Sequence, residues 1–137
     1  DLYLGDEGYQ AVADAGYVQL DESAWGETQS TWEGAGGTPG EPEQGVSGDV
    51  VVSGSSTVEP ISSLVAESFS SANPEAGVSV DGPGTGDGFE LFCNGETDIS
   101  DASRPIEEDE IAACEASGIE YVELKVGIDG IAVITQA

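Results

Sequence analysis

Hydroxyl-bearing residues and glycines gather in three short stretches of the sequence. The stretches are SGSST at residues 53–57, GPGTGDG at residues 82–88 and SDASRP at residues 100–105. Hydroxyls and the unpaired backbone N–H groups of a helix start bind oxyanions without needing a positive side chain. Glycines let the backbone approach a ligand closely. Together the three stretches predict an oxyanion site built from N–H groups and hydroxyls.

Each stretch lies where an expected strand gives way to an expected helix. We expect short strands at residues 49–53, 77–82 and 98–100, and helices at residues 57–72, 86–94 and 105–116. In open α/β sheets the carboxyl ends of the strands line the ligand crevice. Every helix start adds unpaired N–H groups and a partial positive charge. The order therefore predicts an α/β domain in which three helix starts face one crevice.

The chain divides into three parts. Residues 1–33 form two amphipathic pieces, with a helix ending near Gly16, an extended segment at 17–20 and a helix at 21–32. Residues 34–48 are rich in glycine and proline, as in a linker. Residues 49–137 alternate strands and helices and close with two expected strands, at 119–124 and 130–136. We expect one domain in total.

Each chemical feature also has a structural explanation, and these alternatives stay open. Ser56 with Glu59 fits a helix capping box, and the glycine run fits a plain turn. Pro105 is ordinary at a first helical position, and Arg104 fits a surface ion pair. It is the combination of the three turns that favours anion binding.

The charge is strongly negative and is spread along the whole chain. The formal net charge is -26, and Arg104 and Lys125 are the only basic residues in 137. Nucleic-acid binding needs clusters of Lys and Arg and is excluded. Acidic residues between apolar positions indicate a surface adapted to concentrated salt, where charges are screened. Deliberate supercharging and a calcium-loaded surface are the alternatives.

An enzyme is not expected. The sequence has no histidine, so Ser-His and Cys-His pairs are excluded, and GTGDGFEL lacks the lysine of a nucleotide-binding P-loop. No cofactor is implied, no metal-site spacing occurs, and no apolar run of 18 residues predicts a membrane span. The two cysteines, Cys93 and Cys114, fit a disulfide in an extracellular setting or two buried thiols.

Three motifs in order resemble the phosphate-binding proteins of phosphate ABC transporters, the PstS type. They are GSSTVEPISSLVAESF, GPGTGDGFELFCNGETDISDASRPI and GIEYVELKVGIDGIAVI, which together cover about residues 49–135. The resemblance implies a type II periplasmic-binding-protein fold, with a mixed central sheet flanked by helices. It also implies inorganic phosphate as ligand, a membrane permease as partner, and a parent protein that is extracellular, cell-surface or periplasmic.

Residues 1–33 are similar to the C-terminal end of the same family. YLGDEGYQAVADAGYVQLDESAW matches the return of the family's chain to its first lobe, yet here it precedes the matched N-terminal part. We therefore interpret the chain as a single first lobe with its two segments in permuted order, natural or engineered. The permuted order accounts for the linker at 34–48, for the lack of a signal peptide and for the short length.

The resemblance assigns site residues one by one. Thr57 and Val58 match first-loop positions that touch phosphate, Ser56 flanks them, and Thr85 with Gly86 matches the second loop. Ser103 stands where several relatives carry a proton-accepting aspartate, which puts selectivity over sulfate in doubt. Arg104 offers a charge-assisted contact.

Two nearby acids and the absent second lobe limit the expected binding. Asp87 and Asp101 lie in the second and third stretches, and the alternatives for both are the proton-accepting role and, as the favoured interpretation, a solvent-exposed or capping position. A lobe without its opposite wall is expected to bind phosphate weakly. The alternative is a structural lobe that binds no ligand and self-associates through an exposed face.

Overall fold

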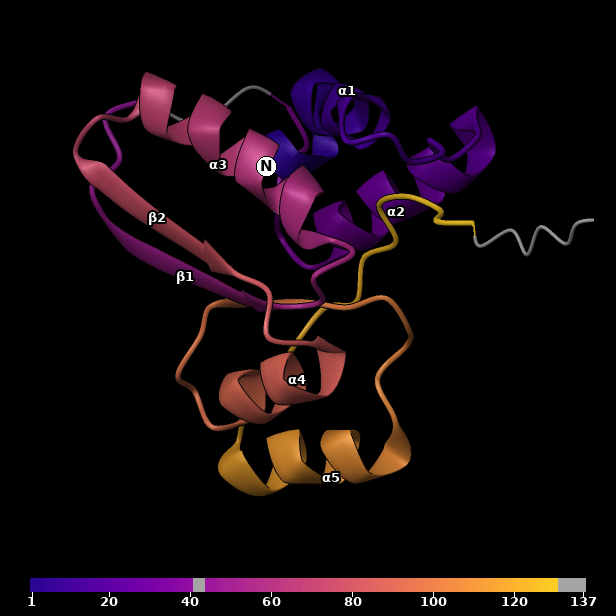
Figure 1. The fold of residues 1–137 in the computed structure, drawn as a ribbon, viewed down its shortest axis with the longest axis vertical. Helices are drawn as coiled ribbons and strands as arrows, with labels where there is room; N and C mark the ends of the chain where they lie inside the picture. Colours follow the sequence, from indigo (N-terminus) through magenta and orange to yellow (C-terminus); the bar gives the residue numbers. More distant parts are fainter. Residues whose placement is uncertain (41–43, 131–137) are drawn as a thin grey trace, which may run out of the picture.

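Three parallel strands form the centre of the protein (Figure 1). The computed structural model describes residues 1–40 and 44–130. Strands β1 (Gly48–Gly54), β2 (Ala76–Asp81) and β3 (Ile99–Asp101) lie in the order β2-β1-β3. β-Branched residues dominate β1, and Val52 in the middle of the sheet pairs with Val80 on one side and Ile99 on the other. The expected α/β fold with a sheet flanked by helices is confirmed.

Helices α3 (Glu59–Ala72) and α4 (Thr85–Cys93) follow β1 and β2 along the chain. α3 packs chiefly on β2, whereas α4 packs on β1 and β3 near their carboxyl ends. α5 (Glu108–Ser117) packs on α4 and ends at Gly118, whose φ of 73° is the left-handed conformation of a helix stop. In Figure 1, α4 and α5 lie at one end of the molecule and α3 at the other.

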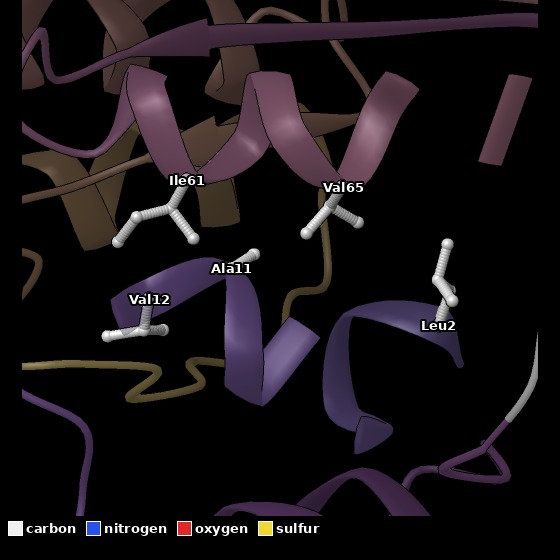
Figure 2. Close-up of a cluster of buried hydrophobic side chains, with 5 residues drawn as sticks. All are labelled: Leu2, Ala11, Val12, Ile61 and Val65. Atoms are coloured by element: carbon white, nitrogen blue, oxygen red, sulfur yellow. The ribbon is translucent and has the colours of Figure 1, made fainter. Parts of the chain in front are cut away.

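The N-terminal segment packs on α3. It contains a short 3₁₀ helix, η1 (Leu2–Leu4), followed by α1 (Asp6–Asp14) and α2 (Glu22–Gly34). Figure 2 shows the cluster that joins these parts, in which Leu2 and Ala11 point towards Ile61 and Val65 of α3 and Val12 lies beside them on the opposite side of α1. Burying such side chains is the main stabilising term available to a small domain.

The end of the described chain also returns to the N-terminal segment. Val18 and Ile128 form an antiparallel bridge, in which each N–H donates to the other's carbonyl at 2.9 Å. The Thr28 hydroxyl donates to the carbonyl of Lys125 at 2.7 Å. Segments far apart in sequence therefore hold residues 125–128 in place.

Several expected elements differ in the structure. The first helix is divided at Gly5 into η1 and α1. The expected strand at 119–124 is wrong, because these residues are irregular and pair with no strand in the part of the chain that the structure describes. Tyr121 and Val122 there are exposed. The expected strand at 130–136 falls, apart from Gly130, outside the described residues. Within the described ranges, no helix has the length and apolar character needed to cross a membrane.

Candidate anion-binding site

The three polar connections meet at the carboxyl ends of the strands. The N–H of Gly84 donates to the carbonyl of Gly54 at 2.8 Å, which joins the connection after β2 to the end of β1. The N–H of Ser55 donates to the carbonyl of Asp101, also at 2.8 Å, which joins the end of β1 to the end of β3. Backbone bonds thus fix the three connections relative to one another.

Two glycines allow this close approach. A Cβ at Gly54 would overlap the carbonyl oxygen of Asp101, and the φ of Gly54 is 149°, a value that other residues rarely adopt. A Cβ at Gly88 would lie only 2.5 Å from the Cα of Gly54. Any larger residue at position 88 would therefore push α4 away from β1.

The first connection is a tight turn that leads into α3. Ser56 is exposed and Thr57 is half-buried, and the N–H of Thr57 donates to Ser55 Oγ at 3.2 Å. α3 begins at Glu59 with Val58 as its N-cap and has no side-chain cap. The alternative in which Ser56 and Glu59 form a capping box is therefore wrong. The exposed hydroxyl of Ser56 lies at the start of a helix, the position that suits an anion.

The second connection starts α4 directly at Thr85. Gly84 is its N-cap with a φ of 133°, and the first backbone bond of the helix runs from Gly88 N–H to Gly84. The N–H groups of Thr85, Gly86 and Asp87 thus have no partner within the helix. Since nothing lies within 4 Å of a Cβ built at Gly86, the space beside this helix start is open.

The third connection reaches the second through hydroxyls. The Oγ atoms of Thr85 and Ser103 lie 3.1 Å apart, and the N–H of Ser103 donates to Thr85 Oγ1 at 3.3 Å. The structure therefore brings together the helix start at 85–86 and Ser103. Of the residues expected at the site, Ser56 and Thr57 lie on the first connection. Thr85 and Gly86 lie on the second connection, and Ser103 lies on the third.

The third helix start lies farther along the chain than expected. α5 begins at Glu108, with Glu107 as N-cap and a capping box between Glu107 and Glu110. The expectation that Pro105 opens this helix is wrong, because the reciprocal Glu107–Glu110 bonds set the start three residues later. Two helix starts, those of α3 and α4, follow the carboxyl ends of β1 and β2.

Arg104 is engaged in an ion pair. Its Nη1 and Nη2 atoms donate to the two carboxylate oxygens of Glu110 at 2.8 and 2.7 Å, and its guanidinium lies 5.4 Å from the ring centre of Phe89. This hydrogen-bonded pair raises the pKa of Arg104 and lowers that of Glu110. The ion-pair alternative is thus what the structure shows, and a contact between Arg104 and a ligand would require this pair to open.

Asp101 was expected at the surface or in a cap, and that expectation is wrong. Its side chain is buried, and Oδ1 accepts a bond from Ser62 Oγ at 2.8 Å. Burial raises the pKa of Asp101 to about 6, and the nearby charge of Glu59 acts in the same direction. The contact of Ser62 with Asp101 was not predicted, because a bond between α3 and β3 leaves no local sequence signal. Asp87 is exposed in the first turn of α4, as expected.

A disulfide joins Cys93 at the end of α4 to Cys114 in α5. The disulfide therefore links α5, which carries Glu110, to α4, whose first residues belong to the candidate site. In residues 1–40 and 44–130 no three metal-ligating side chains gather closely enough to hold a metal ion.

A family model described as the PBP superfamily domain matches residues 39–137. Protein SphX of Synechococcus elongatus is 52% identical over 85 residues, which cover 62% of this chain and 25% of the relative. The phosphate-binding protein PstS of Staphylococcus saprophyticus is 43% identical over 101 residues, covering 73% of this chain and 32% of the relative. The chain thus spans about a quarter to a third of these relatives.

Two solved structures resemble the fold. A possible phosphate-binding protein from Planctomyces limnophilus has a TM-score of 0.55 and 52% identity, covering 56% of this chain and 27% of that one. A phosphate-binding protein of a phosphate ABC transporter from Streptococcus pneumoniae has a TM-score of 0.64, covering 82% and 38% of the two chains. Its identity is 21%, so it supports the fold alone.

Proposed function

The chain belongs to the PBP superfamily domain family, and from this membership we propose that it binds an oxyanion, inorganic phosphate, at the carboxyl ends of β1, β2 and β3. The observation that carries the proposal is the bonding of the three polar connections to one another through Gly84–Gly54, Ser55–Asp101 and Ser103–Thr85. The relatives named for phosphate binding share this part of the chain.

We assign the ligand contacts to neutral donors. Ser56 and Thr57 before α3, Thr85 at the start of α4, and Ser103 supply hydroxyls, and Thr85 and Gly86 also supply N–H groups. Val58, whose N–H donates to the carbonyl of Ser55 at 3.0 Å, is assigned a packing contact with the ligand. Arg104 supports this arrangement by holding α5, and it reaches the anion only when Glu110 releases it. Such donors act at short range, so the net charge of the chain does not prevent binding.

We propose that binding is weak and poorly selective. We infer that these residues correspond to one lobe of the relatives, in permuted order, and they span only about a quarter to a third of those relatives. A titration of residues 1–137 alone therefore measures only the contacts that these residues supply, without the exclusion of water that closure of a second lobe provides. Ser103 cannot accept a proton from HPO₄²⁻ as a carboxylate does, so sulfate should compete. We place the dissociation constant in the millimolar range, or about −4 kcal/mol.

Calorimetric titration with phosphate and with sulfate in molar NaCl tests the proposal. We expect Thr57→Val, which removes a hydroxyl at the start of α3, to weaken binding severalfold. Thr38→Val, in the exposed segment before β1, is the matched control and should bind as the parent does. Absence of binding at 100 mM phosphate, about a hundredfold above the expected constant, would refute the proposal.

In the parent protein this lobe would capture phosphate outside the cell membrane and deliver it to a permease. The phosphate ABC transporter relatives support this role. Sequencing the region around this chain in its source tests it, because a second lobe should be encoded nearby.

A second candidate function is self-association of a structural lobe. β3 is an outer strand of the described sheet, and its residue Ile99 is 41% exposed. Val51 on the neighbouring strand β1 is 37% exposed. An apolar edge strand pairs readily with another chain. Sedimentation at several protein concentrations, read together with the phosphate titration, distinguishes phosphate binding from self-association. A dimer whose population rises with concentration, in a protein that binds no phosphate, would favour the structural role.

A further inference from the structure

Asp101 is a buried carboxylate at the place where the polar connections meet the N-terminal segment. It is 4% exposed and is the last residue of β3. Its carbonyl oxygen accepts the bond from Ser55 N–H, and its Oδ1 accepts the bond from Ser62 of α3. One residue therefore fixes the first connection to both the sheet and a helix.

The bonding continues from Ser62 to Tyr3 of η1. Tyr3 Oη lies 3.1 Å from Ser62 Oγ. A serine hydroxyl has one hydrogen, and Ser62 gives it to Asp101, so Tyr3 must be the donor in the next bond. Burial and the charge of Asp101 both raise the pKa of Tyr3, which keeps its hydroxyl protonated. The order Tyr3–Ser62–Asp101–Ser55 thus links η1 to the first connection by directed hydrogen bonds.

The second carboxylate oxygen of Asp101 is buried without a partner among the described residues. A buried carboxylate with one unsatisfied oxygen is costly when ionised and favours taking up a proton. The titratable groups that face it are Glu59 of α3 and Tyr3 of η1. Its charge therefore changes in mildly acidic solution, directly behind the connection after β1.

We propose that Asp101 is a positioning residue for the anion site, and that through Ser62 and Tyr3 it makes the geometry of residues 55–58 depend on the N-terminal segment. This inference rests on the proposed function. Asp101 does not touch the ligand. Its backbone carbonyl accepts the Ser55 N–H, and its carboxylate is held by Ser62, so the side chain fixes the position of that carbonyl. The ionised carboxylate also adds a negative charge behind a site meant for an anion.

Backbone hydrogen exchange without ligand tests the positioning directly. The Ser55 N–H donates to the backbone carbonyl of Asp101, which every variant keeps, so its exchange reports how firmly the side-chain bonds hold residue 101. In Tyr3→Phe and in Ser62→Ala, which each remove one of those side-chain bonds, we expect the Ser55 amide to exchange severalfold faster than in the parent. The Val52 amide in the middle of β1 should be unaffected. Tyr9→Phe is the matched control, because its hydroxyl bonds the carbonyl of Leu20 within the N-terminal segment and not Ser62.

The pH profile of sulfate binding provides the second readout, because sulfate keeps its charge throughout. Parent affinity should fall as pH rises through about 6, the pKa of Asp101, whereas Asp101→Asn should give a flat profile. Unchanged Ser55 exchange in both Tyr3→Phe and Ser62→Ala would overturn the inference, and so would a parent profile that is already flat. If the parent binds neither phosphate nor sulfate while Ser55 exchange responds, the proposed function is refuted instead. Tyr3→Phe keeps the test valid should Asp101→Asn fail to fold.

Discussion

At the scale of single residues, the absence of a side chain determines the contact between α4 and the sheet. Gly88 faces Gly54, and a Cβ there would also lie 2.9 Å from the carbonyl oxygen of Ser53 and 3.0 Å from Ser100 Oγ. These neighbours are backbone atoms or buried, so they cannot move aside easily. The start of α4, and with it half of the candidate site, depends on this contact.

Gly88→Ala should destabilise the protein by about 1–3 kcal/mol, because overpacking forces α4 away from β1. Urea unfolding measures this, and phosphate affinity should fall in parallel. Gly26→Ala in α2 is the matched control, since a Cβ at Gly26 meets no atom within 4 Å. That variant should be more stable by up to about 1 kcal/mol, from helix propensity. Equal stability of the two variants would contradict the packing argument.

Asp101 should make the protein less stable as pH rises from about 4 to about 6. Its pKa is about 6 in the folded state against an ordinary value of 3.8, so the folded state binds more protons in this window. The free energy of unfolding therefore falls by up to about 3 kcal/mol as pH increases through the window. The comparison is between parent and Asp101→Asn in urea at four pH values, with exposed Asp87→Asn as control. A pH-independent difference between parent and Asp101→Asn would contradict this.

At the scale of elements, the match between expectation and structure depends on how local the signal is. The strand at 49–53 and the helix over 57–72 could be predicted because their apolar periodicity is contained in their own residues. The start of α5 was misplaced because the Glu107–Glu110 capping box outweighs the proline preference. The strand at 119–124 failed because a strand needs a partner that its own sequence does not encode. The burial of Asp101 likewise depends on α3 and η1.

The disulfide between α4 and α5 should contribute about 3 kcal/mol, because it closes a loop with a sequence separation of 21 residues. Replacing both Cys93 and Cys114 by Ser should lower the urea midpoint accordingly. A reductant should lower the midpoint of the parent and leave that of the double-serine variant unchanged. A parent midpoint that does not respond to complete reduction would show that the bridge is not important for stability.

At the scale of the whole molecule, carboxylates greatly outnumber the groups that could pair with them. Arg104 and Lys125 are the only basic residues against 28 acids, so ion pairs cannot balance the repulsion. In dilute buffer this repulsion opposes the compact state. Salt screens this repulsion, and we propose that the acidic surface is an adaptation to concentrated salt.

We therefore expect the melting temperature to rise steeply between 0.1 M and about 3 M NaCl, with most of the rise complete by about 1 M, where the Debye length is about 3 Å. Sucrose at matched viscosity should have a much smaller effect, because it screens no charge. A melting temperature that is flat across the NaCl series would refute the proposal that the acidic surface is an adaptation to concentrated salt.

The packing of α1 on α3 has a consequence for the order of events during synthesis. Ala11 and Val12 leave the ribosome first, yet Ile61 and Val65, which cover them, follow about 50 residues later. At 5–20 residues per second the apolar face of α1 waits roughly 3–10 s for its cover. During that interval the apolar face of α1 is uncovered, and the acidic residues of the same helix, Asp6, Glu7 and Asp14, favour its solubility.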